Sequence, residues 1–189
     1  MAEPKLRMDE DAYLALDRRS ELKHELWDGE VYAMSGASLA HNQIVGNLVR
    51  HLGNALAGSG CRPLPSDMRV RVPPRGRYVY PDVTIVCGPP SLDGEKDILL
   101  NPKTIVEVLS PSTAAFDLGD KFVAYRSIPG LDEIVFVSQH ERRVECYTRQ
   151  ADDSWVLREH RGDGAVVLSV LPVALALRLI YEDVELEGA

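Results

Sequence analysis

The chain has 189 residues and a formal net charge of −8, with 45% hydrophobic and 26% charged residues, a composition typical of a globular domain with a sizeable core. No apolar stretch approaches the roughly 18 residues of a membrane helix, and the polar start does not resemble a signal peptide. We therefore expect a cytoplasmic protein with no membrane partner. The acidic balance argues against a protein that coats nucleic acid non-specifically, because neutralising phosphates takes a basic surface.

The first third of the chain predicts two helices and a hairpin. Residues 9–19 open with acids and carry apolar residues at helical spacing, which predicts a helix. Asp28-Gly29 separates two short runs and predicts a β-hairpin. Ser38 can cap a long helix that Gly58 and Gly60 end. The apolar face expected for this helix contains Val45, Leu48, Leu52 and Leu56.

The middle of the chain alternates strands with a helix. CRPLPSDMRVRVPP and RYVYPDVTIVCG each contain a strand, and a Pro-Pro-Arg-Gly turn joins them. A loop of roughly 15 residues, GPPSLDGEKDILLNP, then precedes the strand TIVEVLS. The helix AAFDLGDKFVAYRSI follows, which Ser112 or Thr113 can cap and Pro129-Gly130 stops.

The last third of the chain predicts strands. EIVFVSQ, RRVECYTRQ and SWVLREHR alternate in polarity as in a β-meander, and short apolar strands follow Ala165. The order of elements predicts one mixed α/β (α+β) domain, residues 1–189, in which a central mixed β-sheet is flanked by helices.

The three cysteines, Cys61, Cys87 and Cys146, are widely spaced and form no CxxC motif. We expect small buried thiols in a reducing compartment, and neither a disulfide framework nor a thiolate zinc site.

Two acidic residues interrupt runs that otherwise read as buried strands: Asp82 in PDVTIVC and Glu107 in TIVEVLS. An unpartnered ionised group costs several kcal/mol to bury, so something must compensate each carboxylate. If the strands are neighbours, the two acids converge and demand a proton or a cation, and hard oxygen ligands favour Mg²⁺ or Mn²⁺. The alternative is that each acid pairs with an arginine or caps a strand end.

The motifs HELWDGEVYAMSGAS..H, SDMRVRV, YPDVTIV, IVEVLSPST, D...K...Y and PGLDEIVFV, in this order, resemble the Uma-type family of the PD-(D/E)XK nuclease superfamily. The resemblance runs from about Tyr13 to about Val184. It implies a restriction-endonuclease-like fold and a metal-dependent endonuclease acting on nucleic acid, with DNA the expected substrate and a homodimer the expected assembly. Asp82, Glu107 and the backbone carbonyl of Val108 would hold Mg²⁺ or Mn²⁺.

The lysine of the superfamily motif is displaced in this sequence. Leu109 occupies the position of the lysine in the E-x-K motif. Lys121 in the following helix is the nearest substitute, as in the Uma-type family. A helix packed back against its preceding strand can aim Lys121 at the two acids, which makes Asp82, Glu107 and Lys121 the catalytic candidates. The alternative for Lys121 is an exposed i,i+4 salt bridge with Asp117.

Four further residues are candidates for supporting the metal ligands: Glu25, His41, Asp67 and Asp117. Glu25 is otherwise a solvated strand acid, and Asp67 is otherwise a turn acid. His41 either orients a carboxylate or is a satisfied core histidine.

Arginines gather in residues 62–77, and four of them are expected to flank the site and contact the phosphate backbone: Arg69, Arg71, Arg75 and Arg77. The rival interpretation is a catalytically silent binding or assembly module of the same fold. The acidic net charge and the missing strand lysine favour this alternative.

Overall fold

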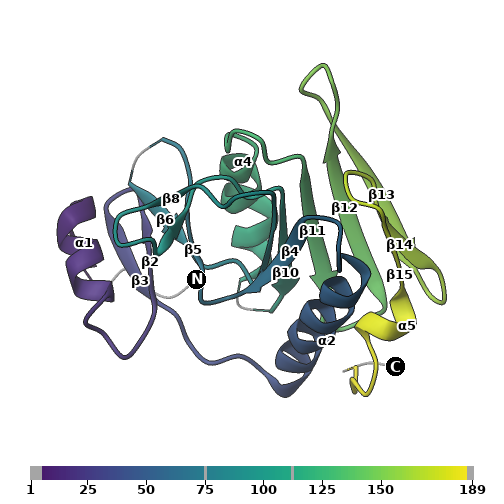
Figure 1. The fold of residues 1–189 in the computed structure, drawn as a ribbon. Helices are drawn as coiled ribbons and strands as arrows, with labels where there is room; N and C mark the ends of the chain where they lie inside the picture. Colours follow the sequence, from purple (N-terminus) through teal and green to yellow (C-terminus); the bar gives the residue numbers. More distant parts are fainter. Residues whose placement is uncertain (1–5, 75, 112, 187–189) are drawn as a thin grey trace.

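The computed structural model describes residues 6–74, 76–111 and 113–186. Within these ranges the strands form a six-stranded, a seven-stranded and a two-stranded sheet. Helix α1 (Glu10–Asp17) lies at one end of the molecule, and helix α5 (Leu177–Ile180) lies at the other (Figure 1). The predicted mixed α+β class, with central mixed sheets flanked by helices, is confirmed.

The six-stranded sheet occupies the middle of the molecule, in the order β13-β12-β11-β10-β7-β4. Its strands are β4 (Cys61–Pro65), β7 (Val83–Cys87), β10 (Thr104–Leu109), β11 (Glu133–Ser138), β12 (Arg143–Arg149) and β13 (Trp155–Arg161). Strands β10 and β11 are parallel, whereas the other neighbours are antiparallel. The predicted meander is the β11–β13 part of this sheet.

The seven-stranded sheet is built from short strands in the order β1-β3-β2-β6-β5-β9-β8. They are β1 (Leu6–Arg7), β2 (His24–Trp27), β3 (Glu30–Ala33), β5 (Arg69–Arg71), β6 (Arg77–Val79), β8 (Leu92–Asp93) and β9 (Ile98–Leu99). The predicted hairpin is β2–β3, in which Asp28 and Gly29 have φ of 51° and 85°, the left-handed conformation of a two-residue turn.

One strand is expected in each of two stretches, but the structure has two strands in each. RYVYPDVTIVCG divides into β6 and β7, and CRPLPSDMRVRVPP divides into β4 and β5, so that each stretch contributes to both large sheets. Pro81 separates β6 from β7 because proline has no amide hydrogen for the ladder. This division allows β7 to enter the central sheet with Asp82 directly before it.

Helix α2 (Leu39–Ala55) covers one face of the six-stranded sheet and buries Ile44, Leu48 and Leu52 against it. Each of these side chains contributes roughly 1.5–3 kcal/mol by leaving water. Ser38 caps the helix as predicted, accepting a hydrogen bond from His41 N at 3.1 Å. Leu48, Leu52 and Leu56 are buried as predicted, whereas Val45 is only partly buried and Ile44 takes its place in the core.

The opposite face of this sheet is covered by a helical stretch of three parts (Figure 1). They are α3 (Ala114–Phe116), the π-helical turn η1 (Asp117–Lys121) and α4 (Phe122–Tyr125). Thr113 makes no side-chain capping hydrogen bond, and Ser112 lies outside the described residues. The chain ends in a hairpin of β14 (Ala165–Leu168) and β15 (Val173–Ala176), followed by α5.

The cysteine prediction is wrong for two of the three residues. Cys61 and Cys87 lie opposite each other in β4 and β7, 4.0 Å apart at their Cα atoms, and form a disulfide. Their separation of 26 residues hides this pairing, because only the register of the two strands brings the sulfurs together. Cys146 is a free, buried thiol, as expected. Among the described residues, no helix is both long and apolar enough to cross a membrane.

Candidate metal centre

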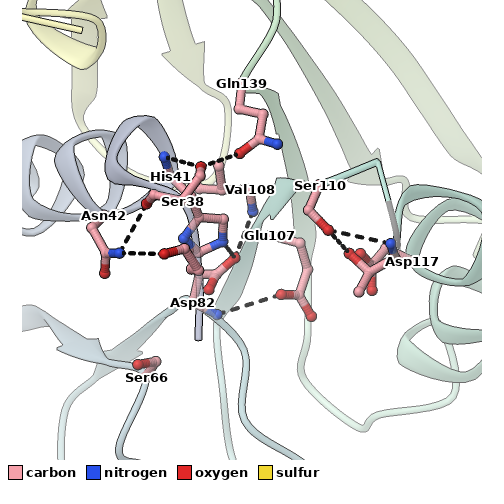
Figure 2. Close-up of polar contacts among 12 residues, drawn as sticks. Ser38, His41, Asn42, Ser66, Asp82, Glu107, Val108, Ser110, Asp117 and Gln139 are labelled. Carbon is pink, nitrogen blue, oxygen red and sulfur yellow. Dashed lines mark hydrogen bonds and ion pairs between the residues drawn. The ribbon is translucent and has the colours of Figure 1, made fainter. Parts of the chain in front are cut away.

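Strands β7 and β10 bring Asp82 and Glu107 together. The antiparallel register pairs Val83 with Val106, so the next position along the ladder sets Asp82 opposite Glu107. Asp82 N donates to Glu107 Oε2 at 3.4 Å, and Val108 N donates to Asp82 Oδ2 at 2.7 Å (Figure 2). The two acids therefore converge across neighbouring strands, as their places in the sequence pattern predict.

Glu107 is a buried carboxylate with only 4% of its surface exposed. Tyr125 Oη donates to Glu107 Oε1 at 2.5 Å, and Lys121 Nζ lies 3.5 Å from the same oxygen. Burial raises the pKa of Glu107 well above its ordinary value, and the positive charge of Lys121 offsets only part of this rise. A carboxyl group in this state binds a proton readily unless further positive charge stabilises its ionised form.

Lys121 points into the protein, and its side chain is 9% exposed. Its Nζ lies 3.1 Å from Glu25 Oε1 and 3.5 Å from Asp117 Oδ1, in addition to its contact with Glu107. Burial disfavours the ammonium, yet the three carboxylates outweigh it and raise the pKa of Lys121. The i,i+4 pair with Asp117 exists, but it is buried and belongs to a larger cluster.

Glu25 and Asp117 complete this cluster from two further elements. Glu25 in β2 accepts hydrogen bonds from Lys121 Nζ and from Tyr80 N, both at 3.1 Å. Asp117 in η1 is 4% exposed, and burial raises its pKa. The seven-stranded sheet and the π turn thus each supply one carboxylate to the ammonium of Lys121.

His41 lies on the other side of the pair, in the first turn of α2. Its Nε2 lies 3.2 Å from Asp82 Oδ2 (Figure 2). Burial opposes the charged imidazole, but the hydrogen bond and charge of Asp82 prevail and raise the pKa of His41. Oδ2 of Asp82 therefore has two partners, the Val108 amide and the His41 imidazole, which fix the orientation of the carboxylate.

Asp67 is not part of this centre. Its side chain is 84% exposed and pairs with Lys23 Nζ at 2.6 Å, in the turn between β4 and β5. The structure supports the turn-acid alternative for this residue.

The expectation that Arg69 contacts phosphate is wrong, because its guanidinium is buried. The side chain is 5% exposed and donates to Asp17 Oδ2 at 2.5 Å and to Asp97 Oδ2 at 2.7 Å. Arg71 pairs with Asp93 at 2.6 Å and keeps about a third of its side chain exposed.

Arg77 and Arg75 complete the set of expected phosphate contacts. Arg77 donates to both carboxylate oxygens of Asp28, at 2.7 and 2.8 Å, and its guanidinium lies 4.7 Å from the ring centre of Trp27. Arg75 lies outside the described residues. Arg71 and Arg77 stay predicted phosphate contacts, each already paired with an aspartate.

Tyr125 is the tyrosine of the D...K...Y motif, but no role in the site is predicted for it from the sequence. Its signal is helical spacing, because Tyr125 follows Lys121 by four residues and Lys121 follows Asp117 by four. The hydrogen bond from the Tyr125 hydroxyl group to Glu107 depends on the packing of α4 against β10, which the sequence does not reveal.

The donor chemistry of the centre fits a divalent cation. Three carboxylates, those of Glu25, Glu107 and Asp117, contact the ammonium of Lys121. Asp82 adjoins Glu107 through its backbone amide and contacts His41. Asp82, Glu107 and the carbonyl of Val108 offer the hard oxygens that Mg²⁺ prefers, and Mg²⁺ usually keeps several waters. The described residues contain no group of three His, Cys, Asp or Glu side chains arranged to hold an ion by themselves, so water would complete the shell.

Comparison with known proteins agrees with this architecture. Two proteins of Synechocystis sp., the uncharacterized proteins slr1290 and sll1609, are 33% and 36% identical to this chain. The first alignment covers 94% of this chain and 92% of the relative, and the second covers 82% and 88%. A solved structure from Anabaena variabilis, described as a "putative nuclease belonging to DUF820", superposes with a TM-score of 0.74 at 16% identity. The superposition covers 92% of this chain and 97% of that one, which shows a shared fold.

The sequence profile of one family, Uma2, described as "Putative restriction endonuclease", matches residues 10–179. The match spans the hairpin with Glu25, the strands with Asp82 and Glu107, and the π turn with Lys121. The chain is therefore a member of the Uma2 family.

Proposed function

We propose that this protein is a Mg²⁺- or Mn²⁺-dependent endonuclease that hydrolyses phosphodiester bonds of nucleic acid, with DNA as the expected substrate. The observation that carries the proposal is the meeting of Asp82 and Glu107 across β7 and β10, with the ammonium of Lys121 directed at Glu107. Membership of the Uma2 family supports the same chemistry.

The residues of the centre have separable roles in this proposal. Asp82, Glu107 and the carbonyl of Val108 would hold the ion, which supplies an activated water and a Lewis acid for the phosphate. His41 keeps Asp82 oriented. Lys121 presents a fixed positive charge to the negative charge that develops on the phosphate, and Glu25 and Asp117 hold its amine in place.

Isosteric variants test this assignment. We expect Asp82→Asn and Glu107→Gln to abolish divalent-dependent cleavage of supercoiled, linear and single-stranded DNA and of RNA, while circular dichroism shows a retained fold. Asp132→Asn is the matched control, because Asp132 is a partly exposed acid that pairs with Lys103 outside the centre. The proposal fails if the wild-type protein cleaves none of these substrates and calorimetry with Mn²⁺ detects no binding.

A catalytically silent nucleic-acid-binding or assembly module is the second candidate. Leu109, at the position of the usual strand lysine, is 6% exposed and belongs to the core beneath α4. The net charge of −8 favours the same alternative. Binding of DNA in the presence of Ca²⁺, without cleavage in Mg²⁺ or Mn²⁺, would support this module over an enzyme.

Two further parts of the proposal concern assembly and location. We expect a homodimer, because cutting both strands of a duplex takes two sites, and light scattering on the purified protein tests this. We also expect a cytoplasmic location, which cell fractionation tests. In a separate experiment, a thiol count on protein alkylated inside intact cells shows whether Cys61 and Cys87 are bonded in that compartment.

A further inference from the structure

The π turn η1 changes the phase of the helix that covers β10. The amide of Phe122 donates to the carbonyl of Asp117, five residues earlier. In a regular α-helix, residues 117 and 125 would lie about 80° apart around the axis, because each residue advances by about 100°. A π turn takes more residues per revolution, so it reduces this angle and brings the two residues toward one side.

The contacts show the result of this change of phase. Lys121 Nζ lies 3.5 Å from both Asp117 Oδ1 and Glu107 Oε1, and Tyr125 Oη lies 2.5 Å from Glu107 Oε1. Lys121 and Tyr125 therefore both contact Oε1 of the buried Glu107, and Asp117 contacts Lys121. Single π turns inside helices occur frequently at functional sites.

The two oxygens of Glu107 have different surroundings. Oε1 has Tyr125 and Lys121 as partners, whereas Oε2 faces Asp82, whose amide lies 3.4 Å away. A carboxylate held through Oε1 cannot rotate freely, so Oε2 stays on the side where the cation would bind.

We propose that Tyr125 is a positioning residue: through its hydrogen bond to Oε1 it fixes Glu107 with Oε2 toward Asp82, and the π turn η1 is the element that delivers it. The inference rests on the proposed function, since it describes how the metal ligand is oriented. Tyr125 acts through Glu107 and touches neither the substrate nor the ion.

A purely structural role predicts different behaviour. The ring of Tyr125 is fully buried and packs in the cluster that contains Ile128 and Phe136. Tyr125→Phe keeps this ring and removes only the hydroxyl group. If packing were its whole contribution, the variant would bind metal and cleave as the wild type does.

The experiment measures metal binding apart from catalysis. For Tyr125→Phe we expect a 10- to 100-fold weaker Mn²⁺ affinity by calorimetry, the range typical of lost outer-shell partners. We also expect kcat to fall with little change in KM. Tyr147→Phe is the matched control, because Tyr147 Oη contacts Glu145 at 3.3 Å on β12, outside the centre, and both parameters should stay at the wild-type level.

The outcomes separate this inference from the proposed function. Wild-type protein without Mn²⁺ binding or cleavage would overturn both. Wild-type binding with an unchanged Tyr125→Phe variant would overturn the positioning role alone.

A second measurement applies if Tyr125→Phe does not fold. 3-Fluorotyrosine is placed at position 125 or at position 147, and the fluorine resonance is followed while Mg²⁺ is added. We expect the resonance at position 125 to shift and to saturate together with calorimetric binding, and the resonance at position 147 to stay unchanged. A constant resonance at position 125 during measured binding contradicts the inference.

Discussion

Lys121 and Glu25 lie 3.1 Å apart, Nζ to Oε1, and this contact joins η1 to β2 across 96 residues of sequence. Their side chains are 9% and 13% exposed, so the pair is largely shielded from water. The seven-stranded sheet is therefore held to the helical cover of the central sheet through the candidate site itself. The cluster contributes to stability as well as to the proposed chemistry.

Lys121→Met removes the ammonium from this cluster and leaves its carboxylates facing one another. We expect the free energy of unfolding to fall by about 3–5 kcal/mol in EDTA, because breaking a buried ion pair leaves uncompensated charge. Mg²⁺ should restore part of the loss, since it supplies positive charge to the same carboxylate of Glu107 through its other oxygen. Urea unfolding with and without Mg²⁺ measures both effects.

Lys103→Met is the control for this prediction. Lys103 and Asp132 form an ion pair in which each side chain is about one-third exposed, and its loss should change stability by less than about 1 kcal/mol. Equal unfolding curves for Lys121→Met and the wild type would contradict a buried, charged Lys121.

Arg69→Met tests whether this arginine stabilises the fold or binds nucleic acid. The variant leaves Asp17, whose side chain is 2% exposed, without its cation. We expect a loss of about 3–5 kcal/mol in urea unfolding. The nucleic-acid affinity of the folded protein should not change, because the guanidinium does not reach the surface.

Arg71→Met provides the comparison. Its pair with Asp93 is partly exposed, so stability should change by less than about 1 kcal/mol. If Arg71 contacts a phosphate, the slope of log affinity against log salt should fall by about 0.9. A salt slope that changes for Arg69→Met and not for Arg71→Met would reverse the assignment.

Glu133 should make stability depend on pH. It is fully buried at the start of β11, where Oε1 accepts hydrogen bonds from Ser169 N and Thr148 Oγ1, at 2.9 and 3.2 Å. Among the described residues, Oε2 of Glu133 and Oγ1 of Thr104 on β10 are buried without a hydrogen-bond partner. Burial raises the pKa of Glu133 from 4.5 to about 6.

The folded state therefore binds this proton more tightly than the unfolded chain does. The stabilisation from Glu133 is fully present below pH 4.5 and is lost as the pH rises through about 6. The difference corresponds to about 2 kcal/mol. Glu133→Gln should be more stable than the wild type by up to about 2 kcal/mol at pH 7.5, and this gain should vanish near pH 4.

Thermal and urea unfolding between pH 4 and pH 8 measure this difference. Glu141→Gln is the control, because the side chain of Glu141 is about half exposed and its change should leave the profile unaltered. A Glu133→Gln variant that is less stable than the wild type at every pH would show that the ionised carboxylate is required.

Local sequence patterns predict the elements whose determinants lie close together in the chain. Asp28-Gly29 specifies its own turn, and Ser38 caps α2 because the amide that donates to it is three residues away. The meeting of Asp82 and Glu107 could also be anticipated, since an acid in a buried strand needs compensation.

Features that depend on distant packing could not be predicted in the same way. The guanidinium of Arg69 is unavailable to phosphate because it is buried and paired with Asp17 and Asp97, which lie far from it in the sequence. The Cys61–Cys87 bond depends on the register of β4 against β7. The role of Tyr125 requires both the π turn and the placement of α4 on β10.

The hydrogen bond from Val108 N to Asp82 Oδ2 makes the candidate site part of the central sheet. This amide lies just beyond the last ladder pair of β7 and β10, Val83 with Val106, next to buried positions of both strands. Fraying of the outer strand β13 or of the C-terminal hairpin leaves it protected. We therefore expect the Val108 amide to exchange slowly with solvent, and local opening elsewhere to leave Asp82 and Glu107 together.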